Sequence, residues 1–422
     1  MKVRRAAVLV ALTLAAGCAG VGVELAGGRL EPLELAVPGR ASAHVTLAAD
    51  GDRIAAAWAA TGANGTDIYA AVSQDGARTF GAPVRVNEID GDASANGEQP
   101  PRVLMQGTAV EILWVSKRAG VAGIRAAAST DGGMTFAPAR SITPAGLTGA
   151  RGWESATLGA DGVVHAVWLD GRAAPSPSSE TRASAAQVPA AAVPGPHHHH
   201  GAMRQDIYHA MWKGAAAPVE TLVASNVCFC CKTAVVSRGT DVFVAWRHLF
   251  PGGVRDIAMA RSADGGRTFQ DPVRVSEDNW KIDACPDDGP AMTIDRRGAL
   301  HVTWPTLVKD ADTQRMAIFE STSQDGGATF SPRARVDGAT SGPAHPRIAA
   351  GSAGPGAVVW DELAQGVRRV LFRPMGGGPP TVLSAGGIPS YPAIAAVDDG
   401  FVVAWTDQAD NASVIRARRI DR

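Results

Sequence analysis

Seven short apolar runs along the chain each end in a tryptophan, and this repetition constrains the fold more than any other feature of the sequence. The tryptophans are Trp58, Trp114, Trp168, Trp246, Trp304, Trp360 and Trp405. Successive tryptophans are separated by 56, 54, 78, 58, 56 and 45 residues. A recurring unit of about 55 residues indicates one repeat protein and not a series of unrelated domains.

Each tryptophan run follows another short apolar stretch across a turn that contains Gly or Asp, which predicts a β-hairpin. Examples of the preceding stretch are residues 101–105, 290–294 and 346–350. A third strand is expected near residues 67–72 and at the matching places in later units, followed by a tight turn and a fourth strand. Four antiparallel strands per unit predict an all-β protein, a β-propeller of four-stranded blades.

The closure of the ring is also predicted. The seventh unit ends after three strands, at residues 414–420, so one outer strand is missing. The segment 30–37 supplies it in our interpretation, which makes residues 30–422 one propeller, most simply of seven blades. Closing a ring in this way leaves few open sheet edges, so we expect a monomer.

Four segments share the pattern Ser-x-Asp-Gly-x-x-Thr-Phe or a close variant: residues 73–80, 129–136, 262–269 and 323–330. The Asp carboxylate is expected to accept backbone N–H groups of a tight turn, and glycine provides a positive φ angle. The first copy departs from the pattern, because Ala77 stands where the other copies have glycine. These residues are predicted to hold turns and to do no chemistry.

The four segments resemble the Asp box of the sialidase and BNR-repeat superfamily. This resemblance covers nearly the whole chain as fold, and six blades are the alternative because sialidases usually have six. It implies three arginines that clamp a substrate carboxylate, a tyrosine nucleophile paired with a glutamate, and an aspartate acid/base. The Arg-Ile-Pro segment expected early in a sialidase is absent; the nearest strings are Pro101-Arg102-Val103 and Pro346-Arg347-Ile348.

The N-terminus reads as an export signal. Three basic residues lie within the first five positions, an apolar stretch follows over 6–16, and Leu14-Ala15-Ala16-Gly17-Cys18 resembles a lipobox. We therefore expect 1–18 to be a lipoprotein-type signal peptide, Cys18 to be lipidated, and 19–29 to be a short linker. The protein would then be exported and lipid-anchored to the bacterial cell envelope, at the outer membrane or cell surface. Ordinary signal cleavage near Ala19 is the alternative.

Composition narrows the classes of partner that the protein is expected to bind. Lys and Arg number 40 and Asp and Glu 41, so there is no basic excess that would favour nucleic acid. The stretch 173–204, rich in Ala, Pro and Ser, cannot build a core and is expected to be a disordered insertion. It ends in His197 to His200, for which we expect at most a weak or incidental affinity for metals.

In a four-stranded blade, the loops that enter the innermost strands surround one mouth of the central channel. The mouth is therefore expected to carry charge of both signs, which suits a polar ligand. The candidate catalytic residues are Tyr391, Asp288 and Glu98. The candidate ligand-binding residues are Arg102, Arg151, Glu154, Arg247, Asp287 and Arg347. The same loops also bring His44, Gln99, Trp153, Lys232 and His345 to the mouth, and Asp361 and Glu362 follow a tryptophan run into it.

Four cysteines cluster in two of these loops. Cys228-Phe229-Cys230-Cys231 enters the fourth unit and Cys285 enters the fifth, so the geometry of adjacent blades brings the sulfurs together. In an oxidising compartment two disulfides are the default. The alternative is a copper(I) or zinc site made by these thiolates with His248 or His345. No cofactor is otherwise expected.

Three functional hypotheses follow. The first is a cell-surface, sialidase-like propeller that binds an extracellular glycan or protein at the channel mouth, with a lipid anchor as its contact with the membrane. The second is a glycoside hydrolase of the exo-sialidase type with a diverged site, using Arg102, Arg247 and Arg347 as the clamp and Tyr391 as the nucleophile. The third is metal binding by the cysteines and a histidine. Whether the protein is an enzyme stays open at this point.

Overall fold

The computed structural model describes residues 32–117, 122–173, 205–228, 230–282, 286–310, 313–338, 342–409 and 412–421. The predicted lipidation site Cys18, the histidines His197 to His200 and Cys285 lie outside these ranges. All regular elements of the described residues are β-strands. No helix that could cross a bilayer occurs in this part of the chain.

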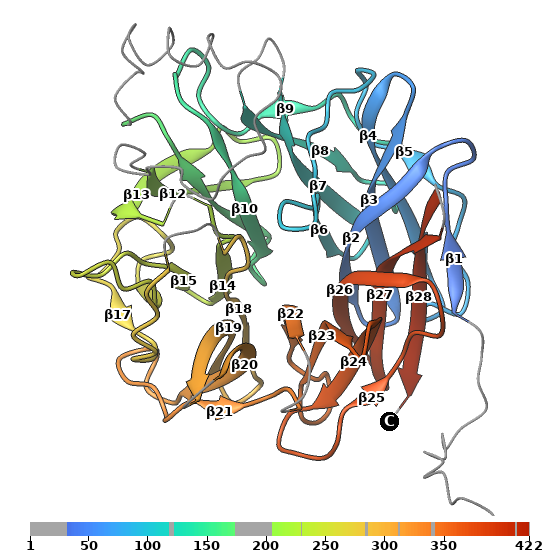
Figure 1. The fold of residues 1–422 in the computed structure, drawn as a ribbon. Coiled ribbons are helices and arrows are strands. Elements are labelled where there is room, and N and C mark those ends of the chain that lie inside the picture. The colour runs from blue at the N-terminus through green and yellow to red at the C-terminus, as the bar shows by residue number, and fades with distance from the viewer. Residues whose placement is uncertain are drawn as a thin grey trace, which may run out of the picture. The chain divides into compact units, whose positions relative to one another are not determined.

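The strands form seven antiparallel four-stranded sheets arranged as a ring (Figure 1). The sheets are blades 1 to 7 in chain order. Blade 1 contains β2 (Ala41–Asp50), β3 (Arg53–Gly62), β4 (Gly65–Ser73) and β5 (Val84–Arg85). Blade 2 contains β6 (Arg102–Gln106), β7 (Ala109–Ser116), β8 (Gly123–Ser129) and β9 (Arg140–Ser141). Blade 3 contains β10 (Arg151–Leu158), β11 (Val163–Asp170), β12 (Gln205–Lys213) and β13 (Val219–Val227).

The remaining blades repeat this order. Blade 4 contains β14 (Ala234–Arg238), β15 (Asp241–Arg247), β16 (Ile257–Ser262) and β17 (Val273–Arg274). Blade 5 contains β18 (Ala291–Ile294), β19 (Leu300–Asp310), β20 (Thr313–Ser323) and β21 (Ala334–Arg335). Blade 6 contains β22 (Gly342–Ala349), β23 (Ala357–Ala364), β24 (Val367–Pro374) and β25 (Thr381–Val382). Blade 7 contains β26 (Ile388–Val397), β27 (Gly400–Ala409), β28 (Ala412–Asp421) and β1 (Leu33–Leu35). The predicted seven-bladed propeller is confirmed, and the six-bladed alternative is wrong.

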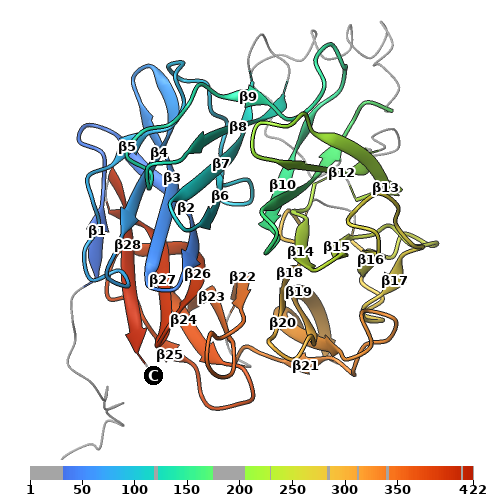
Figure 2. The ribbon, with the colours of Figure 1, turned by 180° about the vertical axis from the view of Figure 1, so that it is seen from behind.

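The N-terminal strand closes the ring. β1 pairs antiparallel with β28, with Leu33 opposite Ala417 and Leu35 opposite Ile415. Figures 1 and 2 show the blue first strand beside the red last strand from both sides of the molecule. Leu35 and Ile415 are buried in the same apolar cluster, so closure buries side chains as well as pairing a sheet edge. The predicted closing strand is therefore confirmed.

The second strand of each blade is buried on both faces, which explains why it reads as a continuous apolar run ending in tryptophan. In β3, residues 54–60 are all buried. Ala55, Ala57 and Ala59 pack toward blade 2, whereas Ala56 and Trp58 pack toward blade 7. Since neighbouring blades cover both of its faces, the second strand of every blade must be apolar on both sides.

The Ser-x-Asp turns have the same internal hydrogen bonds in all four copies. In the third copy, the Asp264 carboxylate accepts the Thr268 N–H at 2.9 Å and the Thr268 hydroxyl at 2.6 Å, while Ser262 Oγ accepts the Gly266 N–H at 2.8 Å. The other three copies reproduce these bonds within 0.1 Å. Each turn lies at the end of its blade away from the loop that enters the innermost strand. The two ends of the ring therefore carry different kinds of structure.

Candidate ligand-binding site at the channel mouth

A cavity of about 400 Å³ opens at the channel mouth. Five blades contribute to it, through the loop before β6, the start of β10, the loop before β18, and the starts of β22 and β26. Its lining residues are Asn96, Gly97, Glu98, Trp153, Pro286, Asp287, His345 and Tyr391. We call this cavity the mouth pocket. Its volume lies within the range of small-molecule sites in proteins.

Backbone distortions aim three of the lining side chains into the mouth pocket. The register of β10, β22 and β26 shifts at Trp153, His345 and Tyr391, and each of these residues has a positive φ, of 53°, 56° and 52°. A β-bulge re-aims a side chain, and a bulky residue with positive φ is strained. Strain of this kind collects at functional sites, so its recurrence at three lining residues makes the mouth pocket the candidate site. His44 in β2 shares the geometry, with a φ of 63°.

A buried ion cluster forms the floor of the mouth pocket. The Lys232 ammonium bonds Asp288 Oδ1 and lies 3.5 Å from Glu98 Oε2. His345 Nε2 lies 3.3 Å from Glu98 Oε1, and the His345 backbone N–H donates to Asp288 Oδ2 at 2.6 Å. Blades 2, 4, 5 and 6 each provide one member. Because Lys232 sits between the two carboxylates, their charges are compensated by the protein itself.

The charges in this cluster shift the pKa values of its members. Burial raises the pKa of Glu98 above its usual value, since Lys232 and His345 offset only part of the lost hydration. For Asp288, burial acts in the same direction, but the charges of Lys232 and His345 prevail and lower its pKa. Asp288 is therefore the ionised partner of Lys232, and Glu98 takes up a proton more readily than Asp288.

His345 links the floor to Tyr391. Its Nδ1 bonds Asp361 Oδ2 at 2.6 Å, and the same oxygen accepts the Tyr391 backbone N–H at 2.9 Å. The His345 and Tyr391 rings pack against each other at a tilt of 33°, with centroids 4.0 Å apart. Burial lowers the pKa of His345, but the hydrogen bond and charge of Asp361 more than offset this, so its pKa is raised. The imidazole is thus held between carboxylates on both ring nitrogens.

A second cavity of about 260 Å³ lies along the channel and contains the predicted arginines Arg102 and Arg347. Both occupy the same register position of their inner strands, opposite the residue before the blade tryptophan. Arg102 Nε donates to the Glu154 carbonyl at 2.8 Å, and burial lowers the pKa of Arg102 to about 10. The Glu154 carboxylate is fully buried without a hydrogen-bond partner, and burial raises its pKa.

The other two predicted ligand-binding arginines have structural contacts. Arg247 is 1% exposed, donates to the carbonyls of Arg255 and Pro305 at 3.0 and 2.8 Å, and lies over the Trp280 ring. Arg151 is buried against Asp170 and the carbonyls of its own loop. Their guanidinium groups are therefore occupied by protein acceptors.

These positions bear on the predicted carboxylate clamp. Arg102 and Arg347 line the inner cavity, Tyr391 lines the mouth pocket, and Arg247 bonds backbone carbonyls. Three arginines that converge beside a tyrosine are not found among the described residues. Burial, together with the charges of Glu98 and Asp361, also raises the pKa of Tyr391, which opposes formation of a phenolate.

The residues predicted as metal ligands do not all lie together in the structure. Cys228, Cys230 and Cys231 lie together, with all three sulfurs within 4.8 Å of one another. His248 is not part of this group, because its Nδ1 accepts the Trp246 indole N–H at 3.1 Å. No described pair of cysteines is at disulfide distance, so the predicted disulfides are not confirmed, and any bond to Cys285 lies outside the described residues.

Sequence reasoning placed Lys232, Trp153, His345 and Asp361 at the mouth but gave only His345 a role, as an alternative metal ligand. Apart from their loop positions, the signal for Lys232 was weak. A lysine directly after Cys231 reads as a solvated loop residue, whereas in the structure it is 2% exposed. Lys232 is distinguished by its pairing with two carboxylates, which blades 2 and 5 bring to it. The residues that surround Lys232 in the sequence do not predict that pairing.

Comparison with known proteins supports the fold alone. No protein-family model matches the chain, and no curated protein matches it. Among solved structures, a Dyadobacter fermentans protein of unknown function is similar at 12% identity and TM-score 0.51, covering 92% of this chain and 99% of its own. A polysaccharide lyase, an ulvan lyase of family PL25, is similar at 11% identity and TM-score 0.50, covering 91% and 94%. A Trypanosoma rangeli sialidase follows at 9% identity and TM-score 0.48, covering 80% and 55%.

Proposed function

We propose that this chain is a sialidase-like propeller of the BNR-repeat type that binds an extracellular glycan at the mouth pocket. The observation that carries the proposal is the composition of that pocket. Two aromatic rings, Trp153 and Tyr391, line it together with Asn96, Glu98 and Asp287, and these five residues come from four different blades. Sugars combine an apolar ring face with several hydroxyl groups, and this lining offers a partner for each.

The aromatic rings supply apolar area of defined shape, and the polar residues supply directional hydrogen bonds. Carboxylate and amide oxygens accept hydroxyl hydrogens, and the amide of Asn96 also donates. Because contacts with Lys232 and His345 hold the buried Glu98 carboxylate in place, the floor of the mouth pocket keeps its shape when a ligand arrives. A preorganised site loses less entropy on binding.

The charge of the mouth pocket favours a neutral sugar over a sialoside. Glu98 and Asp287 line it, while the Lys232 ammonium is paired with Asp288 beneath. The guanidinium groups of Arg102 and Arg347 belong to the inner cavity. The lining of the mouth pocket therefore offers no arginine to a carboxylate placed beside Tyr391, whereas the clamp of a sialidase needs three. These observations favour binding over hydrolysis of the exo-sialidase type.

We further propose that the ring works outside the cytoplasm as a lipoprotein carried by Cys18. The support is the lipobox-like string that ends at this cysteine. Mass spectrometry of the membrane fraction should find the mature N-terminus at a diacylated Cys18. The Cys18→Ala variant should leave the membrane fraction; equal membrane retention of both forms would contradict the anchor.

The binding proposal is tested with the purified ring, residues 19–422, on an array of neutral and sialylated glycans, followed by calorimetry on the best ligand. Trp153→Ala and Tyr391→Ala should each weaken binding at least about tenfold, because each removes one stacking face. Met134→Ala, an exposed side chain of a Ser-x-Asp turn at the other end of the ring, is the matched control.

Three outcomes decide between the hypotheses. Tighter binding of neutral glycans, lost in both aromatic variants and kept in the control, supports the proposal. Absence of binding to every glycan, or affinity unchanged in the aromatic variants, contradicts it. Release of fluorophore from a fluorogenic sialoside, abolished in Tyr391→Phe, would instead establish the hydrolase hypothesis.

A further inference from the structure

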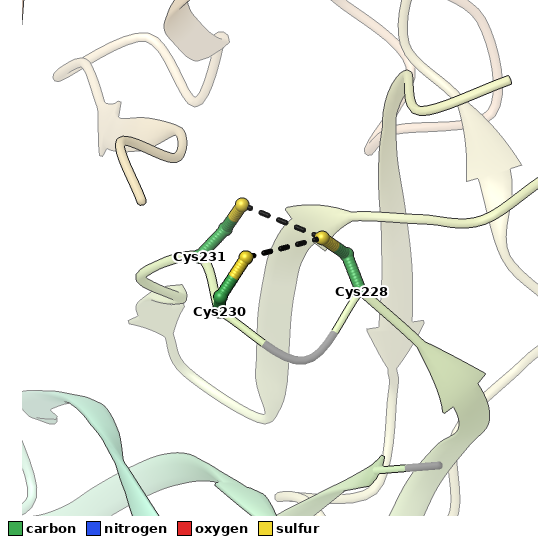
Figure 3. Close-up of side chains that lie close together, drawn as sticks. All are labelled: Cys228, Cys230 and Cys231. Carbon is green, nitrogen blue, oxygen red and sulfur yellow. Dashed lines mark hydrogen bonds between the residues drawn. The ribbon is translucent and has the colours of Figure 1, made fainter. Parts of the chain in front are cut away.

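Three thiols converge at the side of the mouth pocket without an assigned purpose. Figure 3 shows Cys228 at the end of β13 and Cys230 and Cys231 on the following turn, with their sulfurs directed toward one another. The sulfur of Cys228 lies 3.6 Å from that of Cys231 and 3.9 Å from that of Cys230. All three side chains are buried, at 4%, 2% and 2% exposure. Close approach of three buried sulfurs requires an explanation.

The separations fit a shared metal ion and not a disulfide. A disulfide joins its sulfurs at about 2.05 Å. Thiolates that bind one ion at about 2.3 Å lie roughly 3.8 Å apart in tetrahedral and about 4.0 Å apart in trigonal geometry. The two distances to Cys228, 3.6 and 3.9 Å, lie close to these values. Two of the three sulfur separations thus match the spacing that one ion needs, and all three sulfurs lie within 4.8 Å of one another.

The surroundings of the cluster suit negatively charged sulfur. Arg255 Nη1 lies 3.6 Å from the Cys228 sulfur, within hydrogen-bond reach. The Cys228 backbone N–H donates to the Arg247 carbonyl, which ties the start of the loop to β15. Trp153 packs over the group from blade 3. A cation beside the sulfurs and an apolar cover are what a buried thiolate site requires, since cations favour the thiolate form and burial excludes water.

The donor set selects the class of metal. Thiolate is a soft ligand, and soft d10 cations, copper(I) and zinc(II), are the ions that it prefers. Histidine and carboxylate are not among the atoms grouped with the three sulfurs in the described residues. His248, the histidine nearest in the sequence, is held by the Trp246 indole.

We infer that Cys228, Cys230 and Cys231 together bind one thiophilic d10 cation, copper(I) or zinc(II), as a permanent part of the propeller. The site goes beyond glycan binding and does not depend on it. It has a structural consequence for the mouth. Lys232 follows Cys231 directly, its backbone N–H donates to the Asp287 carbonyl, and the next residue, Thr233, bonds the Trp153 carbonyl. An ion held by the three sulfurs would therefore fix the loop that supplies the floor lysine and that bonds the backbone of Trp153 in the wall of the mouth pocket.

The test uses the reduced, purified ring, loaded anaerobically with copper(I) or with zinc(II), and counts bound metal after desalting. One equivalent is expected for at least one of the two ions, and competition with chromophoric chelators distinguishes copper(I) from zinc(II). Cys228→Ser, Cys230→Ser and Cys231→Ser should each lower affinity at least about a hundredfold. His248→Ala is the matched control and should keep full affinity, because its imidazole is held elsewhere.

A second readout needs no variant and so does not depend on the folding of the serine forms. Wild-type protein is alkylated with and without bound metal, and the modified cysteines are identified by mass spectrometry. Protection of Cys228, Cys230 and Cys231 together supports the inference. Failure of the reduced protein to bind either ion overturns it, as does metal binding that leaves these three thiols as reactive as before. A disulfide among the three in protein isolated without reductant would also overturn it.

Discussion

The two ends of the ring are built from different kinds of contact. At one end, four Ser-x-Asp turns repeat nearly identical hydrogen bonds, each made within five consecutive residues. At the other end, the ion cluster of the mouth occurs once, and its contacts join residues far apart in the chain, such as Glu98 with Lys232 and Lys232 with Asp288. Repetition marks structure that every blade needs, whereas the contacts that break the repeat mark the candidate site.

This contrast also predicts different losses of folding free energy for substitutions at the two ends of the ring. The aspartate of each turn bonds groups within its own turn, so its loss affects one blade. A member of the ion cluster is buried among charges from other blades, so its loss leaves an uncompensated charge in the interior. Substitutions at the two ends of the ring should therefore differ in size and in how strongly they couple to distant residues.

The largest effect is expected for Lys232→Met. Removing the ammonium takes away the ion-pair partner of the buried Asp288 and leaves His345 as the neighbour of Glu98, which should lower the free energy of unfolding by about 3–5 kcal/mol. Urea denaturation followed by tryptophan fluorescence measures it. Lys213→Met, at an exposed lysine of β12, is the control and should change little. Partial recovery in the double variant Lys232→Met/Asp288→Asn is expected; a loss below about 1 kcal/mol in the single variant would show that the cluster contributes little to stability.

The next largest effect is expected for Gly266→Ala, in the third turn. The φ of Gly266 is +86°, and a Cβ there would lie 2.2 Å from Cε1 of His209, which is fully buried. Backbone strain and the clash together should destabilise the protein by about 2–4 kcal/mol. Gly239→Ala, also at positive φ but with open space around its Cβ, isolates the strain. Equal losses in both variants would mean that the contact with His209 is easily relieved.

A pH-dependent effect is expected at His345. Because Asp361, Asp288 and Glu98 raise its pKa in the folded protein, its contribution is fully present below the unfolded value of about 6.5 and is lost as the pH rises through the folded pKa. The stability difference between wild type and His345→Gln should be largest near pH 6 and smaller near pH 9. Thermal melts across this range measure it, and a constant difference would argue that His345 stays neutral throughout.

The smallest effect is expected for Ala77→Gly, which restores the glycine of the other turns. Ala77 has a φ of 60°, so the change relieves strain of about 1–2 kcal/mol. Glycine adds freedom to the unfolded chain and removes a buried methyl group, and these two effects offset most of that gain. We expect a net change below about 1 kcal/mol in chemical denaturation. A larger stabilisation would show that the methyl group of Ala77 packs poorly.

Much of the fold could be predicted, because its signals are local. The tryptophan runs gave the second strands, since a strand covered by blades on both faces must be apolar throughout. The missing outer strand of the last unit gave the closure by residues near Leu33. For the site, loop positions alone brought Glu98, Asp288 and Tyr391 to the mouth, where the structure has them. The same reasoning could not tell which neighbouring residues turn inward.

Arg247 illustrates that limit. It follows Trp246 into a mouth loop and looked like a ligand for a carboxylate, yet its guanidinium is buried against the carbonyls of Arg255 and Pro305. His248 looked like a metal ligand and instead accepts a hydrogen bond from Trp246. Both side chains are captured by groups that other strands bring to them.

The sequence by itself determined the repeat, the seven blades, the closing strand and the turns, because each depends on residues near one another in the chain or on a pattern of burial. Only the tertiary structure decided that Lys232 lies between Glu98 and Asp288, that strained residues such as His345 and Tyr391 face one pocket, and that three sulfurs lie within 4.8 Å of one another. The physical reason is that pairing of charges and convergence of ligands depend on distances across blades, and residue order specifies those distances only after the ring has closed.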